Sequence, residues 1–284
     1  MTALLPAALA AALLAASPAA PNAPARAPAG PVQRGHAPVN GLRIYYEIHG
    51  PAGAKGPPLV LLHGGGSSID TSFASLLPAL ARHRRVIAFD QQGHGRTADL
   101  PDRPFTFEQS ADDAAALLRH LGVARADLLG FSNGGTIALR VAVRHPALVR
   151  RLVVASTLVR RDGLAPQAWE AIRRGRLEDM PVELRQAYLA VAPHPDQLAS
   201  FHAKSARRML EFRDWPDAEV RSITVPVLVV AGDRDAVLPE HAVALTRMLP
   251  DARLAVLPAT DHDGVVRRRV EWLGPMIEAF LDEP

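Results

Sequence analysis

Residues 126–137 read ADLLGFSNGGTI and predict a strand, a sharp turn and a helix in immediate succession. The turn carries the pentapeptide G-x-S-x-G. A serine at such a turn has a strained backbone, so small residues are needed two positions before and two positions after it. Gly130 and Gly134 meet this need, which makes Ser132 a candidate nucleophile. A purely structural glycine turn has the same sequence, so other segments must separate the two interpretations.

Four other segments follow, or end, short apolar runs that are typical of buried strands. They are LLHGGGSS at 61–68, VIAFDQQGHGRT at 86–97, AGDRDAVLP at 231–239 and DHDG at 261–264. Together with GFSNGG at 130–135, and in this order, they resemble the α/β-hydrolase fold superfamily, in its lid-bearing serine hydrolase or esterase branch. The resemblance extends over roughly residues 35–282.

This resemblance implies an eight-stranded, mostly parallel sheet with helices on both faces. It also implies a catalytic triad in the chain order Ser132, Asp235, His262 and an oxyanion hole formed by the backbone N–H groups of Gly65 and Asn133. A serine at the turn argues against the dehalogenases and epoxide hydrolases of this fold, which use an aspartate nucleophile.

Several acidic residues near the predicted site need to be assigned. Asp235 is preferred to Asp233 as the triad acid, and Asp261 and Asp263 are interpreted as solvated loop or capping residues. One departure from the family pattern is Gln92, at a position where the family commonly has arginine. That arginine is usually structural, so the catalytic prediction is unaffected.

Composition excludes several other classes of function. The chain has 284 residues, 48% of them hydrophobic, and a net charge of +3 with basic and acidic residues interspersed, so no nucleic-acid partner is indicated. It contains no cysteine, which excludes disulfides and thiolate sites. His63, His94 and His262 each lie in one of the quoted segments and not at metal-ligand spacing. We therefore expect no metal and no cofactor.

The first 35 residues differ in kind from the rest. Residues 1–20 are rich in alanine and leucine without charge, and 21–31 alternate proline with alanine. This pattern predicts a signal peptide followed by a linker, and hence a periplasmic or secreted protein. The few residues that precede the apolar run lack lysine and arginine, so a low-complexity tail on a cytoplasmic protein is the alternative. The apolar run is too short to span a membrane, and no later segment is a transmembrane candidate.

Alternating strand-like and helical patterns predict a hydrolase core over 36–157 and 218–284. Residues 158–217 contain three amphipathic patterns and no strand-like run, which predicts a small helical lid.

We expect a serine hydrolase that acts on small to medium, largely apolar carboxylic esters. The alternatives are hydrolysis of C–C bonds, lactones or amides, perhydrolysis, or ligand binding without turnover. The oligomeric state, the natural substrate and the choice between hydrolysis and acyl transfer stay open.

Overall fold

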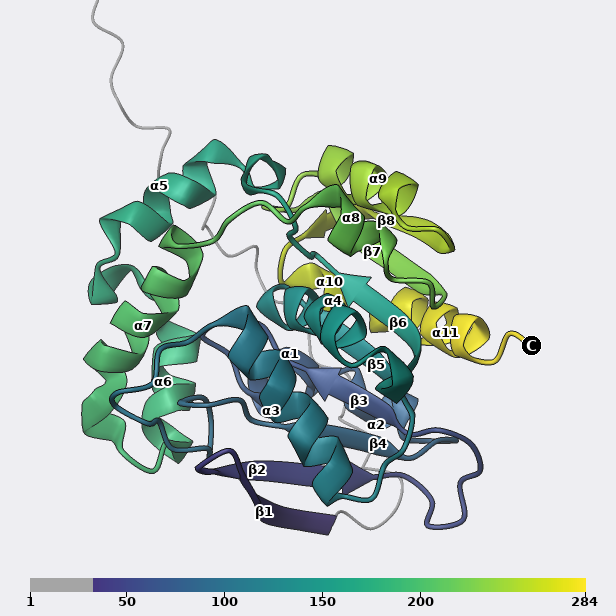
Figure 1. Cartoon of the computed structure of the whole chain (residues 1–284). Coiled ribbons are helices and arrows are strands. Elements are labelled where there is room, and N and C mark those ends of the chain that lie inside the picture. Colours follow the sequence, from purple (N-terminus) through teal and green to yellow (C-terminus); the bar gives the residue numbers. More distant parts are fainter. Residues whose placement is uncertain (1–32) are drawn as a thin grey trace, which may run out of the picture.

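The central sheet has eight strands, all within residues 33–284, which the computed structural model describes (Figure 1). Their order is β1-β2-β4-β3-β5-β6-β7-β8. Strands β1 and β2 pair antiparallel with each other, β2 pairs antiparallel with β4, and every later pairing is parallel. The predicted mostly parallel, eight-stranded sheet is confirmed. The strands are β1 (Gln33–Val39), β2 (Leu42–His49), β3 (Leu59–Leu62), β4 (Val86–Phe89), β5 (Ala126–Phe131), β6 (Val149–Ala155), β7 (Val227–Arg234) and β8 (Ala252–Asp261).

Strand β1 begins inside the range that the sequence analysis assigned to the linker. Most residues of its sequence, QRGHAPV, are exposed at the edge of the sheet, so the strand lacks the apolar run of a buried strand. Pairing with β2 along its whole length makes it a strand, and this is a tertiary effect that composition hides. The predicted signal peptide lies outside the described residues.

The two faces of the sheet are covered by different helices. Alternate residues of β3 show this division: Val60 and Leu62 belong to one buried cluster, and Leu59 and Leu61 belong to the other. The first cluster is closed by α3 (Phe107–His120), α4 (Asn133–Arg144), α8 (Asp217–Arg221) and α9 (Pro239–Met248), and the second by α1 (Ile69–Phe73), α2 (Leu77–Leu80), α10 (Gly264–Arg267) and α11 (Val270–Leu281). The predicted placement of helices on both faces is confirmed.

Between β6 and β7 the chain leaves the sheet and forms three longer helices. They are α5 (Pro166–Arg174), α6 (Val182–Val191) and α7 (Leu198–Leu210), joined by short 3₁₀ turns that include η3 (Leu177–Asp179) and η4 (Pro195–Gln197). We call α5, α6, α7 and their connections the inserted helices. Figure 1 shows them grouped along one side of the molecule, at left.

Helix α7 is bound to the core by a partly buried lysine. Lys204 Nζ donates to Asp99 Oδ2 at 2.6 Å and to the carbonyl oxygens of Leu100 and Arg103 at 2.9 and 3.1 Å. An apolar cluster that contains Phe105 of the core and Phe201 of α7 lies beside it. Polar and apolar contacts therefore hold α7 against the core. Within residues 33–284, no helix is both long enough and apolar enough to cross a bilayer.

Candidate active site

The turn between β5 and α4 places Ser132 at the carboxyl end of the sheet. Its φ and ψ are 54° and −123°, a conformation that a side-chain-bearing residue rarely adopts. A Cβ on Gly130 would lie 2.3 Å from the Gly134 carbonyl oxygen, and a Cβ on Gly134 would lie 2.0 Å from that of Leu62. Both flanking glycines are therefore needed, because the backbones approach too closely for any side chain.

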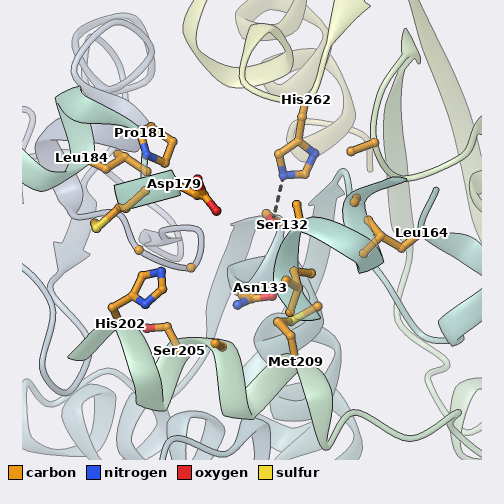
Figure 2. A pocket seen from close by; sticks show the side chains of 18 of the residues that line it. Ser132, Asn133, Leu164, Asp179, Pro181, Leu184, His202, Ser205, Met209 and His262 are labelled. Atoms are coloured by element: carbon orange, nitrogen blue, oxygen red, sulfur yellow. Dashed lines mark hydrogen bonds between the residues drawn. The ribbon is translucent and has the colours of Figure 1, made fainter. Parts of the chain in front are cut away.

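The structure brings Ser132, His262 and Asp235 together in one hydrogen-bonded chain. His262 Nε2 lies 3.0 Å from Ser132 Oγ, and His262 Nδ1 lies 2.6 Å from Asp235 Oδ1. Figure 2 shows the imidazole reaching toward the serine. Since the carboxylate accepts a hydrogen bond from the Nδ1–H group, Nε2 is free to accept the proton of the serine hydroxyl. The three residues come from the ends of three different strands, as the sequence predicts.

The pKa values of Asp235 and His262 are shifted in opposite directions. Burial favours the neutral form of Asp235, but hydrogen bonds from His262, Ser156 and Val237 outweigh it and hold the pKa of Asp235 below its ordinary value. Burial also disfavours the charged form of His262, yet the Asp235 carboxylate outweighs it and raises the pKa of His262 above 6.5. Asp235 thus stays ionised and stabilises the imidazolium.

The second oxygen of Asp235 has a partner that the sequence analysis did not identify. Ser156 Oγ donates to Asp235 Oδ2 at 2.5 Å. Ser156 directly follows β6, and its φ is 54°, so it shares with Ser132 a backbone conformation that is rare outside glycine. A serine immediately after an apolar strand is the only sequence signal, and it is a weak one.

The other acidic residues near the site are exposed, as predicted for Asp261 and Asp263. Asp233 is exposed, and its Oδ1 accepts a hydrogen bond from the Thr260 backbone N–H at 2.9 Å. Asp261 pairs with Arg268, and Asp263 lies 3.6 Å from Arg267. None of these three carboxylates hydrogen-bonds to His262.

Gly65 and Asn133 lie side by side next to Ser132, at the floor of the site. A Cβ on Gly65 would be 2.4 Å from Asn133 Nδ2, so any larger residue at position 65 would displace the Asn133 side chain. The peptide that carries the Gly65 N–H also carries the Gly64 carbonyl, which accepts a 2.9 Å hydrogen bond from His63 Nδ1. His63 Nε2 in turn accepts from the Gln91 N–H at 3.0 Å. Burial lowers the pKa of His63 to about 4, so the ring is neutral and holds this peptide in place.

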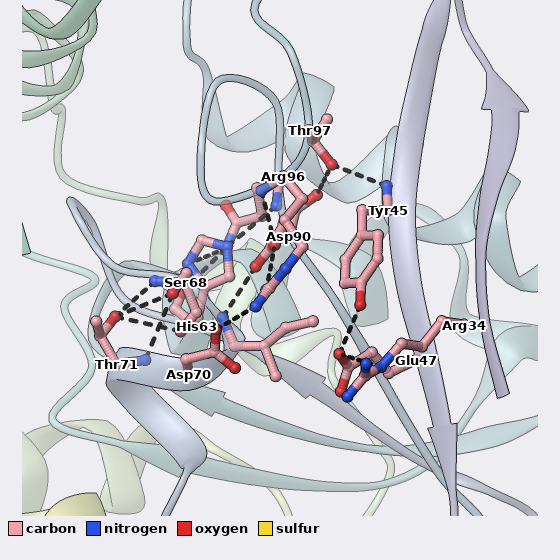
Figure 3. Close-up of polar contacts among 12 residues, drawn as sticks. Arg34, Tyr45, Glu47, His63, Ser68, Asp70, Thr71, Asp90, Arg96 and Thr97 are labelled. Atoms are coloured by element: carbon pink, nitrogen blue, oxygen red, sulfur yellow. Dashed lines mark hydrogen bonds and ion pairs between the residues drawn. The ribbon is translucent and has the colours of Figure 1, made fainter. Parts of the chain in front are cut away.

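A buried carboxylate fixes the rest of the loop (Figure 3). Asp90 Oδ1 accepts from the Ile69 N–H, and its Oδ2 accepts from the Arg96 N–H, both at 2.9 Å. Arg96 also pairs with Asp70 on α1. Burial raises the pKa of Asp90 to about 6. Gln92, the departure from the family pattern, donates to Asp99 Oδ1 at 2.7 Å, so its role is structural.

A cavity of about 400 Å³ opens in front of Ser132, between the sheet and the inserted helices (Figure 2). Gly65, Asn133, Ser156 and His262 line its floor. Its walls are mostly apolar and include Leu158, Leu164, Ala168, Ala171, Ile172, Leu184, Phe201, Met209 and Val237. Polar side chains return at one side, where Arg176, Asp179, His202 and Ser205 also line the cavity. Among residues 33–284, no group of three or more His, Cys, Asp or Glu side chains is placed to hold a metal.

Comparison with known proteins identifies relatives over most of the chain. A family model described as the alpha/beta hydrolase fold matches residues 57–199. The 2-hydroxymuconate semialdehyde hydrolase of Pseudomonas sp. strain CF600 is 31% identical over 230 residues, which are 73% of this chain and 81% of that protein. The dihydrolipoyllysine-residue acetyltransferase component of the acetoin cleaving system of Pseudomonas putida is 33% identical over 81% of this chain, but the match spans only 64% of that longer protein.

A solved structure has a similar fold. The enol-lactonase from Burkholderia xenovorans LB400 superimposes with a TM-score of 0.70 at 27% sequence identity, and the match covers 87% of this chain and all of that one. A chain of this architecture with these relatives is an enzyme of the hydrolase type.

Proposed function

Since the chain belongs to the α/β-hydrolase family, we propose that it is a serine hydrolase that cleaves small to medium, largely apolar carboxylic esters through an acyl-enzyme. The observation that carries this proposal is the unbroken chain of hydrogen bonds from Ser132 through His262 to Asp235 at the floor of a mostly apolar cavity. Function has to be argued from such a site, because this fold hosts many chemistries.

In the proposed mechanism, His262 takes the proton of Ser132 as Oγ attacks the ester carbonyl. The N–H groups of Gly65 and Asn133 stabilise the tetrahedral oxyanion, and loss of one such donor costs about 10²–10³ in rate. His262 then protonates the departing alcohol. A water molecule, activated by the same imidazole, hydrolyses the acyl-enzyme and regenerates Ser132. Asp235 keeps Nδ1 protonated throughout.

The inserted helices are proposed to act as a lid over this site. Their apolar side chains would hold the acyl or alcohol part of the substrate, and a cavity of about 400 Å³ suits a small or medium molecule better than a polymer. Their position also limits the access of bulk water to the ester, which favours charge stabilisation by the protein.

The test is covalent labelling and ester hydrolysis in parallel. We expect wild-type protein to react with a serine-directed fluorophosphonate and to hydrolyse p-nitrophenyl esters from acetate to dodecanoate with an optimum at short or medium chains. Ser132→Ala should abolish both reactions and leave the circular-dichroism spectrum unchanged. Labelling that persists in Ser132→Ala would refute the assignment of the nucleophile.

A second candidate is the hydrolysis of a lactone or a C–C bond by the same residues. Two similar proteins, an enol-lactonase and a 2-hydroxymuconate semialdehyde hydrolase, are named for such reactions and support this candidate. Labelling of Ser132 without turnover of any p-nitrophenyl ester would favour lactone or C–C bond hydrolysis, or ligand binding without turnover, over ester hydrolysis.

We also propose that the chain is exported, on the strength of residues 1–31 alone. Expression of the full chain in a bacterial host, followed by fractionation and mass determination of the amino terminus, tests this proposal. A cytoplasmic protein with an intact amino terminus would contradict it.

A further inference from the structure

Ser156 lies between the two strands that carry the proposed nucleophile and acid. Strand β6, which ends one residue before it, separates β5 from β7 in the sheet. The Ser132 N–H donates to the carbonyl oxygen of Ala155, and the Ser156 N–H donates to that of Val230, both at 2.8 Å. The end of β6 is therefore tied to both sides of the site, and the Ser156 side chain points to the acid.

The Asp235 carboxylate is fully buried, so each of its oxygens needs donors from the protein. Oδ1 accepts from His262 Nδ1 at 2.6 Å and from the Val237 N–H at 2.9 Å. Oδ2 accepts from Ser156 Oγ at 2.5 Å, and its other donor, the Gly232 N–H, is 3.5 Å away. Among residues 33–284, the Ser156 hydroxyl is thus the one close donor to this oxygen.

The backbone at Ser156 gives a second, independent observation. Its φ of 54° lies in the region that glycine adopts without strain and other residues rarely adopt. The residue is 1% exposed and belongs to none of the apolar clusters. A strained, buried, polar residue at the floor of the cavity is better explained by what its hydroxyl does than by packing.

We propose that Ser156 is a positioning residue for the reaction, the fourth member of a hydrogen-bonded chain that runs from Ser132 through His262 and Asp235 to the end of β6. This inference rests on the proposed function. The hydroxyl keeps its proton and takes no part in bond making. It fixes the rotation of the carboxylate, and it shares the negative charge that would otherwise act on His262 alone.

Removal of the hydroxyl should affect the reaction in two ways. The carboxylate becomes freer to turn, so His262 is less well oriented and the maximal rate falls. The carboxylate also keeps more of its charge for His262, so the imidazolium is more stable and the acid limb of the pH profile moves upward.

Other charged groups around this pair stay in place in such a variant. Asp261 and Asp263, which are paired with Arg268 and Arg267, and the Arg176–Asp179 pair on the cavity wall are unaltered. A shift of the acid limb therefore reports on Ser156.

The experiment measures the rate of fluorophosphonate labelling from pH 5 to 9. Labelling needs an activated serine but no knowledge of the natural substrate. We expect Ser156→Ala to lower the saturating rate at pH 7 about tenfold, the value of one hydrogen bond to a charged group, with little change in the half-saturating concentration. The acid limb should move upward by about half a pH unit. Ser110→Ala is the matched control, because Ser110 is another buried serine that accepts a hydrogen bond from Arg208, and neither residue lines the cavity. This variant should label within about twofold of wild type.

Two further variants separate the hydroxyl from the backbone. Ser156→Gly relieves the positive φ and removes the hydroxyl, so it should behave like Ser156→Ala, and it also serves if the alanine variant does not fold. In an Asp235→Asn background, Ser156→Ala should have almost no further effect, because the charge that the hydroxyl stabilises is gone.

The outcomes distinguish this inference from the proposed function. Wild-type protein that is not labelled refutes the proposed function. Wild-type protein that is labelled, together with Ser156→Ala labelled at the same rate and with the same acid limb, overturns the role of Ser156 alone. The inference is equally overturned if only the glycine variant is slow, or if the effects of Ser156→Ala and Asp235→Asn multiply.

Discussion

Replacement of Asp235 by asparagine removes one charge from the site and leaves its shape nearly unchanged. The imidazolium that forms at His262 during the reaction lies 2.6 Å from the carboxylate, atom to atom. With charge centres about 4 Å apart and an effective dielectric constant of about 20, the lost attraction is about 4 kcal/mol. This corresponds to a loss of roughly 10³ in kcat/KM.

The matched control lies two residues away. Asp233→Asn removes a carboxylate at the end of β7, but this side chain is exposed, and an amide oxygen can still accept from the Thr260 N–H. We expect its kcat/KM to stay within about twofold of wild type, as is usual for surface substitutions.

The assay is hydrolysis of p-nitrophenyl butyrate from pH 5 to 9, with melting temperatures measured in parallel. Because Asp235 raises the pKa of His262, Asp235→Asn should move the acid limb downward, opposite to the shift expected of Ser156→Ala. Equal losses in Asp233→Asn and Asp235→Asn would refute this assignment of the acid. So would a folded Asp235→Asn protein that retains more than about a tenth of wild-type activity.

Three other perturbations test separate features. Gly134→Ala should lower the melting temperature by several degrees or prevent folding, because the new Cβ would lie 2.0 Å from the Leu62 carbonyl oxygen. The loss is expected although alanine normally favours a helix over glycine. A melting temperature equal to that of wild type would contradict the close approach. In wild-type protein, kcat/KM should fall as the pH drops through the pKa of His262, which lies above the ordinary 6.5, because only the neutral imidazole accepts the serine proton. A profile that is flat down to pH 5 would argue against His262 as the base. Ala168→Phe should fill part of the cavity and reduce hydrolysis of p-nitrophenyl octanoate about tenfold more than hydrolysis of the acetate. An unchanged chain-length profile would show that the acyl chain does not lie against this wall.

The sequence alone was sufficient for the fold and for the order of the candidate site residues. The reason is largely local: a G-x-S-x-G turn between an apolar run and a helix can be accommodated in few ways. Gly130 is required by the backbone of that turn itself, whereas Gly134 is required by the close approach of Leu62 on the neighbouring strand β3. The buried parallel strands are equally visible, because both of their faces are apolar.

The tertiary structure decided what depends on contacts between distant segments. The polar strand β1 exists because β2 pairs with it. The serine after β6 approaches Asp235, 79 positions later in the chain, only because β6 and β7 are neighbours in the sheet. The cavity likewise takes its shape from how the inserted helices pack on the core. Local pattern therefore specified the elements and their order, whereas the packing of the sheet and helices determined which side chains meet.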